Sequence, residues 1–214
     1  MQNVCLKKTD DMSIKNVVFD YGGVLVDWNP RYLYDRYFND QVKSQWFLDN
    51  ICLYSWNLQM DGGKPFAEGV AELQAQYPEW SEAIAIYHSR WEEMMAGEID
   101  GTAEVLRRLK RAGYGIYGLT NWSAETFPII RDKYSVFKEF DGMVVSGEEH
   151  LLKPDPAIYR CLLERYSLEA VESIFVDDNA DNVSGAKSVG MQAVRFSTAQ
   201  QLERDLREIY KLEF

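Results

Sequence analysis

Five short apolar runs, rich in β-branched and aromatic residues, constrain most strongly what this chain can fold into. Each run ends in polar or glycine-containing residues. The runs are 16–20 (NVVFD), 115–121 (GIYGLTN), 142–146 (GMVVS), 173–178 (SIFVDD) and 191–196 (MQAVRF). Runs this short, and apolar on both faces, are typical of buried parallel strands.

Helical patterns separate the later runs. They cover 102–112, 123–133, 155–166, 179–189 and 198–211. Gly113 follows the first of them where a C-terminal cap is expected, and Ser123 and Asp155 are expected to begin the next two. Strands that alternate with helices predict right-handed crossovers and an α/β fold with a doubly wound parallel sheet.

Almost one hundred residues separate the first two predicted strands, which is too many for one crossover. Residues 29–97 contain no predicted strand. Helical stretches in this segment include 30–38, 64–77 and 79–95. We therefore predict an α/β core formed by 1–28 and 98–214, with an all-α helical unit inserted at 29–97.

Tryptophan is concentrated in this insertion. Five of the six tryptophans lie between residues 28 and 91. We expect most of them to fill the core of a small helical bundle, and one or two to line a ligand cleft.

The net charge of the chain limits the classes of ligand that it is expected to bind. The chain of 214 residues has 23 basic and 34 acidic side chains and a formal net charge of −11. A field of that sign repels nucleic acid and anionic membranes, so neither is expected as a partner. An anionic substrate then needs a local cation. With three scattered cysteines and two histidines, a bound metal would be held by carboxylates, which favours magnesium or calcium.

No segment approaches the roughly 18 apolar residues of a membrane helix. The N-terminal residues lack the apolar segment of a signal peptide, so we expect a reducing, cytoplasmic location. We expect these residues to form a frayed leader, with Met12 as an alternative start. No pattern predicts an oligomeric state.

Polar side chains follow four of the predicted elements at the edge where ligands bind in open α/β sheets. They are Asp20, Thr120 with Asn121, Lys153, and the pair Asp177 and Asp178. Each has a structural explanation of its own, as a turn, a helix cap or a surface dipeptide. Adjacent carboxylates after an apolar strand are harder to explain in this way, because burying two like charges is costly without a counterion. The ordered set indicates one ligand site.

In this order the segments resemble the four motifs of the haloacid dehalogenase (HAD) superfamily. The motifs are VVFDYGGVL (17–25), GLTN (118–121), KPDP (153–156) and FVDDNADN (175–182). The likeness spans essentially residues 16–196, and the helical insertion resembles that superfamily's C1 cap. The resemblance implies a Rossmann-like core and hydrolysis of small phosphorylated metabolites.

The resemblance implies a nucleophile and a Mg²⁺ site. Asp20 would attack phosphorus and form an aspartyl-phosphate. Mg²⁺ would be held by Asp20, the Gly22 carbonyl and Asp178, with Asp177 close by or acting through water.

The phosphoryl oxygens have their own predicted partners. Thr120, the backbone N–H of Asn121 and Lys153 would bind them. Lys153 would also neutralise Asp20.

The acidic pair favours a metal-dependent phosphatase over the other activities of this superfamily. A 2-haloacid dehalogenase also uses the first aspartate, but on carbon and without needing Asp177 and Asp178. A mutase is a further alternative. Gly22 also motivates a non-enzymatic alternative, namely a catalytically weak module that binds a phospho-ligand or a protein.

Gly22 departs from the phosphatase pattern, which has an aspartate there that protonates the leaving group. General acid catalysis contributes about 10²–10⁴-fold. A subgroup with glycine at this position resembles bacterial phosphatases of anomeric phosphates such as glucose 1-phosphate, whose hemiacetal leaves readily. A sugar 1-phosphate is therefore the expected substrate.

Residues after the first motif are candidates to replace the missing acid. Asp27 and Trp28 are expected to face the site, Asp27 as a hinge cap or a substrate contact. Arg31 and His88 are further candidates, although a lone helical histidine such as His88 is expected to be a surface or core residue.

Overall fold

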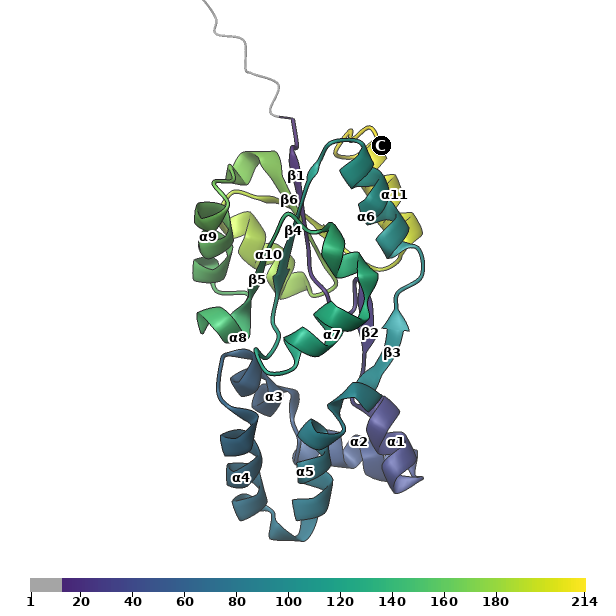
Figure 1. Ribbon diagram of the computed structural model, residues 1–214, viewed down its shortest axis with the longest axis vertical. Coiled ribbons are helices and arrows are strands. Elements are labelled where there is room, and N and C mark those ends of the chain that lie inside the picture. Colours follow the sequence, from purple (N-terminus) through teal and green to yellow (C-terminus); the bar gives the residue numbers. More distant parts are fainter. Residues whose placement is uncertain (1–12) are drawn as a thin grey trace, which may run out of the picture.

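The core of the protein is a five-stranded parallel sheet, in a computed structural model that describes residues 13–214 (Figure 1). Its strand order is β5-β4-β1-β6-β7, and every neighbouring pair is parallel. The strands are β1 (Asn16–Phe19), β4 (Gly115–Thr120), β5 (Gly142–Val145), β6 (Ser173–Asp177) and β7 (Gln192–Arg195). The predicted α/β fold is confirmed. The chain leaves β1 toward β4 and leaves β6 toward β7, so the switch point that favours ligand binding lies between β1 and β6.

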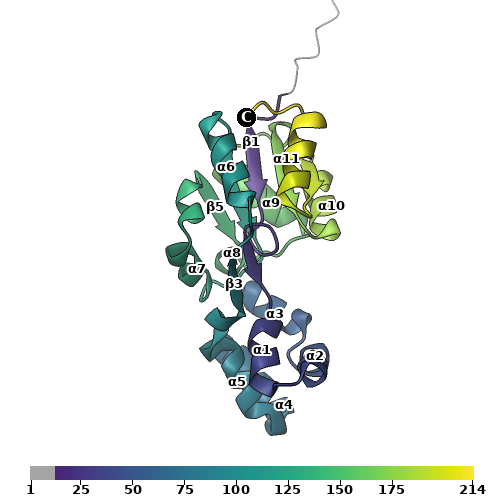
Figure 2. The same cartoon turned by 90° about the vertical axis from the view of Figure 1, so that its right-hand side faces the viewer.

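Helices cover both faces of this sheet (Figures 1 and 2). One face carries α6 (Thr102–Arg111) and α11 (Ala199–Glu208), and the other carries α9 (Pro156–Arg165) and α10 (Ala180–Ser188). In β1, Val17 and Phe19 join the apolar cluster of α6 and α11, whereas Val18 joins that of α9 and α10. All three side chains are fully buried. This two-sided burial explains why the strands are continuously apolar.

Of the three residues predicted to begin or end a helix, two do so and one does not. The Asp155 side chain accepts a hydrogen bond from Ala157 N–H (2.8 Å) and caps α9, and Gly113 ends α6 with a φ of +96°. Helix α7 (Phe127–Lys133) begins four residues later than predicted. Ser123 Oγ instead accepts from Glu125 N–H in a turn (3.2 Å). The short α8 (Ser146–Glu149) follows β5.

The helical insertion lies below the sheet (Figure 1) and contains five α-helices. They are α1 (Arg31–Phe38), α2 (Gln41–Asn50), α3 (Tyr54–Asp61), α4 (Phe66–Gln76) and α5 (Ser81–Ser89). Their core is aromatic: the Trp80 ring lies 5.9 Å from Phe38 and 5.4 Å from Phe47, centroid to centroid.

An antiparallel ribbon joins this insertion to the core. Its strands are β2 (Val26–Trp28) and β3 (Met95–Glu98), with Val26 opposite Glu98. The prediction that 29–97 contains no strand was therefore wrong at its C-terminal end, and the helix predicted over 79–95 ends at Ser89. Strands of three and four residues are too short for a period to be recognised, and each is stabilised by its partner. The predicted boundaries at 28/29 and 97/98 fall in this ribbon.

Among residues 13–214, no helix has both the length and the apolar character needed to cross a bilayer. The expected leader, with Cys5 and Met12, lies outside the described residues.

Candidate active site

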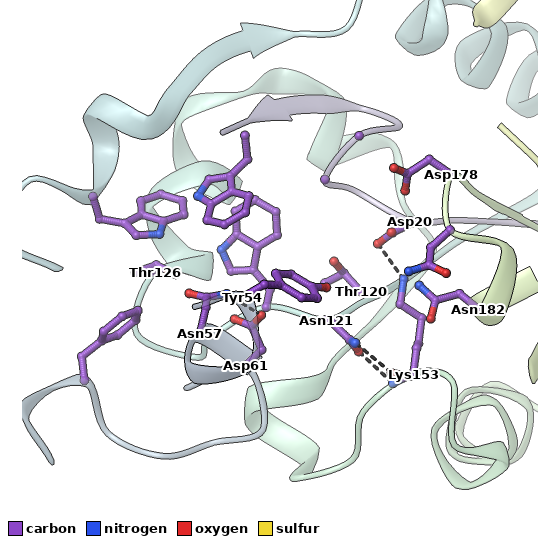
Figure 3. Close-up of a pocket in the computed structure, with 17 residues that line it drawn as sticks. Asp20, Tyr54, Asn57, Asp61, Thr120, Asn121, Thr126, Lys153, Asp178 and Asn182 are labelled. Carbon is purple, nitrogen blue, oxygen red and sulfur yellow. Dashed lines mark hydrogen bonds and ion pairs between the residues drawn. The ribbon is translucent and has the colours of Figure 1, made fainter. Parts of the chain in front are cut away.

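A cavity of about 390 Å³ opens at the carboxyl ends of β1, β4 and β6, between the core and the helical insertion (Figure 3). This volume is within the range of roughly 300–1,000 Å³ that is usual for small-molecule sites. The core contributes Asp20, Gly22, Gly23, Thr120, Asn121, Trp122, Thr126, Lys153, Asp178, Asn179 and Asn182. The ribbon and insertion contribute Trp28, Tyr54, Asn57, Asp61, Phe66 and Trp91. The strand-end residues predicted from the sequence, Asp177 apart, all line this one space.

Lys153 is the centre of a buried ion cluster. Its Nζ lies 2.8 Å from Asp20 Oδ1 and 2.7 Å from Asp177 Oδ2, and it donates to the Leu119 carbonyl at 3.1 Å. Burial lowers the pKa of Lys153, but Asp20 and Asp177 outweigh this effect and raise the pKa above its ordinary value. Lys153 therefore stays charged and holds the two carboxylates in place.

The two oxygens of Asp20 differ. Oδ1 accepts from both Lys153 and the Tyr21 backbone N–H, the latter at 2.8 Å. Within residues 13–214, no hydrogen bond reaches Oδ2, which leaves that oxygen free to meet a ligand. Burial raises the pKa of Asp20 to about 8, against the opposing effect of Lys153. An added cation at this site would favour the ionised carboxylate.

Asp177 and Asp178 have different environments. Asp177 is fully buried, and both of its oxygens are used: Asn179 N–H and Asn182 Nδ2 donate to Oδ1, and Lys153 and Asn182 donate to Oδ2. Asp178 is exposed and lines the cavity. Its carboxylate is therefore better placed than that of Asp177 to bind a ligand directly.

The donor set suits a hard divalent cation. Asp20, Asp177 and Asp178 each offer a carboxylate oxygen, and these atoms lie within 4.8 Å of one another. Among the residues that line the cavity, Lys153 is the only basic one. A phosphate dianion would enter a site with more negative than positive charge, so a cation bound by these oxygens fits the chemistry.

Gly23 provides the space for Asp178. Its φ is +75°, and a Cβ on this residue would lie 2.7 Å from Asp178 Oδ2. Any other residue would therefore be strained in the left-handed region and would displace the carboxylate.

We expect Gly23→Ala to weaken the binding of a divalent cation such as Mg²⁺ at this site and to lower the melting temperature, with backbone strain of about 1–2 kcal/mol. Gly113→Ala is the matched control, since Gly113 also has a positive φ but no atom lies within 4 Å of its added Cβ. Metal titration and thermal melting of both variants give the result. Equal Mg²⁺ affinities of the two variants would contradict the role assigned to Gly23.

Thr120 is the last residue of β4 and Asn121 follows it, at the strand end where both were predicted. The Asn121 side chain has a structural role as well. Thr120 is almost fully buried and lines the cavity. The Asn121 side chain donates from Nδ2 to the Lys153 carbonyl (3.0 Å) and accepts at Oδ1 from Lys153 N–H (2.8 Å). It therefore fixes the backbone that carries Lys153, a role that the motif did not reveal.

The structure separates Trp28 from Asp27. Trp28 lines the cavity, whereas Asp27 does not and accepts instead from the Tyr32 hydroxyl (2.7 Å). Successive residues of a strand point to opposite sides, which is why only one of the two faces the site. The prediction that Asp27 faces the site is thus corrected, and its alternative role as a hinge cap stays a prediction.

Arg31 and His88 also lie away from the cavity. Arg31 pairs with Asp35 at 3.2 Å. The His88 ring stacks on Phe66 with centroids 4.3 Å apart, and Nε2 lies 3.6 Å from Glu125. His88 is thus the structural residue that was expected.

Three residues of α3 line the cavity without having been predicted, namely Tyr54, Asn57 and Asp61. Asn57 Nδ2 donates to Asp61 Oδ2 (2.9 Å), and the Tyr87 hydroxyl donates to Asn57 Oδ1 (3.1 Å). Asp61 is only 8% exposed, and burial raises its pKa to about 7. No motif marks these residues. The Asp-Gly-Gly sequence at 61–63 suggests only a turn.

Known proteins resemble this chain in sequence and in fold. A family model described as haloacid dehalogenase-like hydrolase matches residues 14–190. The chain is 29% identical over 198 residues to a sesquiterpene phosphatase from Aspergillus oryzae, covering 92% of this chain and 97% of that protein. It is 31% identical to a glyceraldehyde 3-phosphate phosphatase from Pyrococcus furiosus, covering 63% and 57%. A magnesium complex of a HAD-family enzyme from Bacteroides thetaiotaomicron has the same fold, with a TM-score of 0.69, 20% identity, and coverage of 90% and 99%.

Proposed function

This chain belongs to the haloacid dehalogenase-like hydrolases and is a hydrolase of phosphate esters, and from this premise we propose that it is a Mg²⁺-dependent phosphatase of small phosphorylated metabolites that forms an aspartyl-phosphate on Asp20. The observation that carries the proposal is the free Oδ2 of a buried Asp20 whose Oδ1 is held by Lys153. A fixed carboxylate with one open oxygen, in the lining of a cavity, suits attack on a bound phosphoryl group.

In the first step Asp20 Oδ2 bonds to phosphorus as the ester P–O bond breaks. The leaving oxygen takes the electron pair and a proton. In the second step water attacks phosphorus, the bond to Asp20 breaks, and inorganic phosphate is released. Thr120 and the backbone N–H of Asn121 bind phosphoryl oxygens, and Lys153 attracts them by its charge, since its three N–H donors already reach Asp20, Asp177 and the Leu119 carbonyl.

Mg²⁺, held by Asp20, the Gly22 carbonyl and Asp178, would supply the positive charge that lets two anions meet. Asp177 would act indirectly by holding Lys153. We further propose that the helical insertion is a cap over this site and that the protein works in the cytoplasm. The unpaired Cys52 and Cys161 fit such a reducing compartment.

The substrate has two candidates. A sugar 1-phosphate follows from Gly22, since an anomeric leaving group needs less protonation. A sesquiterpene monophosphate is favoured by the relative that matches almost the whole chain and by the aromatic lining of the cavity, namely Trp28, Tyr54, Phe66, Trp91 and Trp122. Aromatic rings provide a large apolar surface for a hydrocarbon body.

The test compares kcat/KM for glucose 1-phosphate and farnesyl monophosphate, with and without Mg²⁺, beside an activated aryl phosphate. Phosphate release that requires Mg²⁺ supports the proposed activity, and the faster of the two esters identifies the substrate class. Halide release from a 2-haloacid in excess chelator would identify a dehalogenase instead. Binding of phosphate without turnover of any ester would support the alternative that the protein is a catalytically weak module that binds a phospho-ligand.

A further inference from the structure

The direction of phosphoryl transfer determines where a proton donor must lie. Attack and departure occur on opposite sides of phosphorus, roughly in line. Asp20 and Lys153 belong to the core, so the leaving oxygen of a bound ester points toward the helical insertion. Figure 3 shows Asn57 and Asp61 on the far side of Thr120 and Tyr54 from Asp20 and Lys153. The group that protonates the leaving oxygen is therefore to be sought among the insertion residues that line the cavity.

Few of these residues can donate a proton near neutral pH. A tyrosine has an ordinary pKa of about 10, and desolvation raises that of Tyr54 further. Lys153 stays charged in its cluster with two carboxylates. Asp61 is the carboxyl group that remains once the metal and nucleophile roles are assigned, because the acidic residues lining the cavity are Asp20, Asp61 and Asp178.

Asp61 is held firmly at this position. Its backbone carbonyl accepts from Ser146 Oγ in the core (2.5 Å), and nearby Phe66 N–H donates to Glu125 in the core (2.8 Å). Its side chain accepts at Oδ2 from Asn57, and a backbone hydrogen bond from Ser123 partly opposes the effect of burial on its pKa. Burial keeps its pKa near 7, close to the value at which a general acid works best at neutral pH.

We infer that Asp61 is the general acid that replaces the aspartate missing at Gly22, an inference that rests on the proposed phosphatase activity. As the bond between phosphorus and the ester oxygen breaks, the electron pair stays on that oxygen, which takes the proton from the Asp61 carboxyl. The water that then hydrolyses the aspartyl-phosphate gives a proton to the Asp61 carboxylate and so restores the acid. Asn57 acts as a positioning residue for this carboxyl.

The test is the dependence of kcat/KM on the leaving group for wild type, Asp61→Asn and Asp49→Asn, all with Mg²⁺. Asp49 is an exposed aspartate of the helical insertion, bonded to Gln45 and outside this cavity, and is the matched control. We expect Asp61→Asn to slow a primary alkyl phosphate by about 10²–10⁴-fold, the usual size of general acid catalysis. Its effect on 4-nitrophenyl phosphate should be less than about tenfold, because that leaving group departs without a proton. Asp49→Asn should follow wild type.

A second variant distinguishes loss of the general acid from a change in folding. Gly22→Asp restores a carboxyl at the other position, and its backbone allows a side chain, since Gly22 lacks a left-handed φ and its added Cβ meets only the Trp122 ring at 3.3 Å. Gly22→Asp introduced into Asp61→Asn should recover hydrolysis of the alkyl ester. Equal slowing of aryl and alkyl esters in Asp61→Asn, with no recovery in the double variant, would overturn the assignment of Asp61. If wild type cleaves none of these esters, the proposed function itself fails.

Discussion

Asp20→Asn should lower kcat/KM for every phosphate ester by at least about 10³-fold, the scale of loss when a covalent nucleophile is removed. An amide is not a nucleophile, but it has almost the shape of the carboxylate, so its oxygen can still accept from Lys153 and Tyr21 N–H. Lys153 also keeps its pair with Asp177. We therefore expect the variant to be folded, with a melting temperature close to that of wild type.

Mass spectrometry of a quenched reaction provides a second measurement. In wild type, one phosphoryl group should be found on the peptide that contains Asp20, and Asp20→Asn should lack it. Activity close to wild type in a pure sample of Asp20→Asn would contradict the covalent mechanism.

Removing the metal, or the carboxylate that binds it directly, should give the second large loss. Excess chelator should abolish turnover, and added Mg²⁺ should restore it. Asp178→Ala should raise the Mg²⁺ concentration for half-maximal activity by at least about 100-fold, because loss of a direct ligand exceeds the usual effect of an outer partner. Asp177→Ala should cost less activity, since both oxygens of Asp177 already bind protein groups.

Stability should follow the opposite order. Asp177→Ala removes one of the two carboxylates that pair with buried Lys153 and should destabilise the protein by about 3 kcal/mol, as expected for a broken buried ion pair. Asp178 is exposed, so its removal should leave the melting temperature nearly unchanged. Metal titration beside thermal melting separates the two effects. Full activity in chelator would refute the metal requirement, and equal shifts in Mg²⁺ dependence would refute only the assignment of the two carboxylates.

The core of this site could be predicted because its chemistry is local. Asp20, Thr120 and Asp178 each come at the end of a strand, and parallel strands bring such ends to one edge of the sheet. Gly23 is a residue whose role the local sequence does not predict. The adjacent Gly22 is the residue that departs from the motif, but the contact that requires a glycine at position 23 is with Asp178, far along the chain.

The insertion side of the site could not be predicted in this way. Asn57 and Asp61 lie on a helix that no motif identifies, and their place in the cavity depends on how α3 packs on the core through Ser146. Asp27 and Trp28 were predicted together, but the direction of each side chain is set by the pleat of a strand three residues long. Such a strand exists only because β3 pairs with it, at a sequence separation that a local pattern cannot reveal.

The β2–β3 ribbon brings the two ends of the helical insertion side by side, with Val26 opposite Glu98. A segment whose ends already meet adds little loop-closure entropy to the domain that accepts it, and its length can change at small cost, because that entropy grows only slowly with length. The five-stranded sheet is complete without it. The whole segment can thus be exchanged between related chains at the ribbon, with little effect on the stability of the core. Such an exchange would give one phosphoryl-transfer core new substrates.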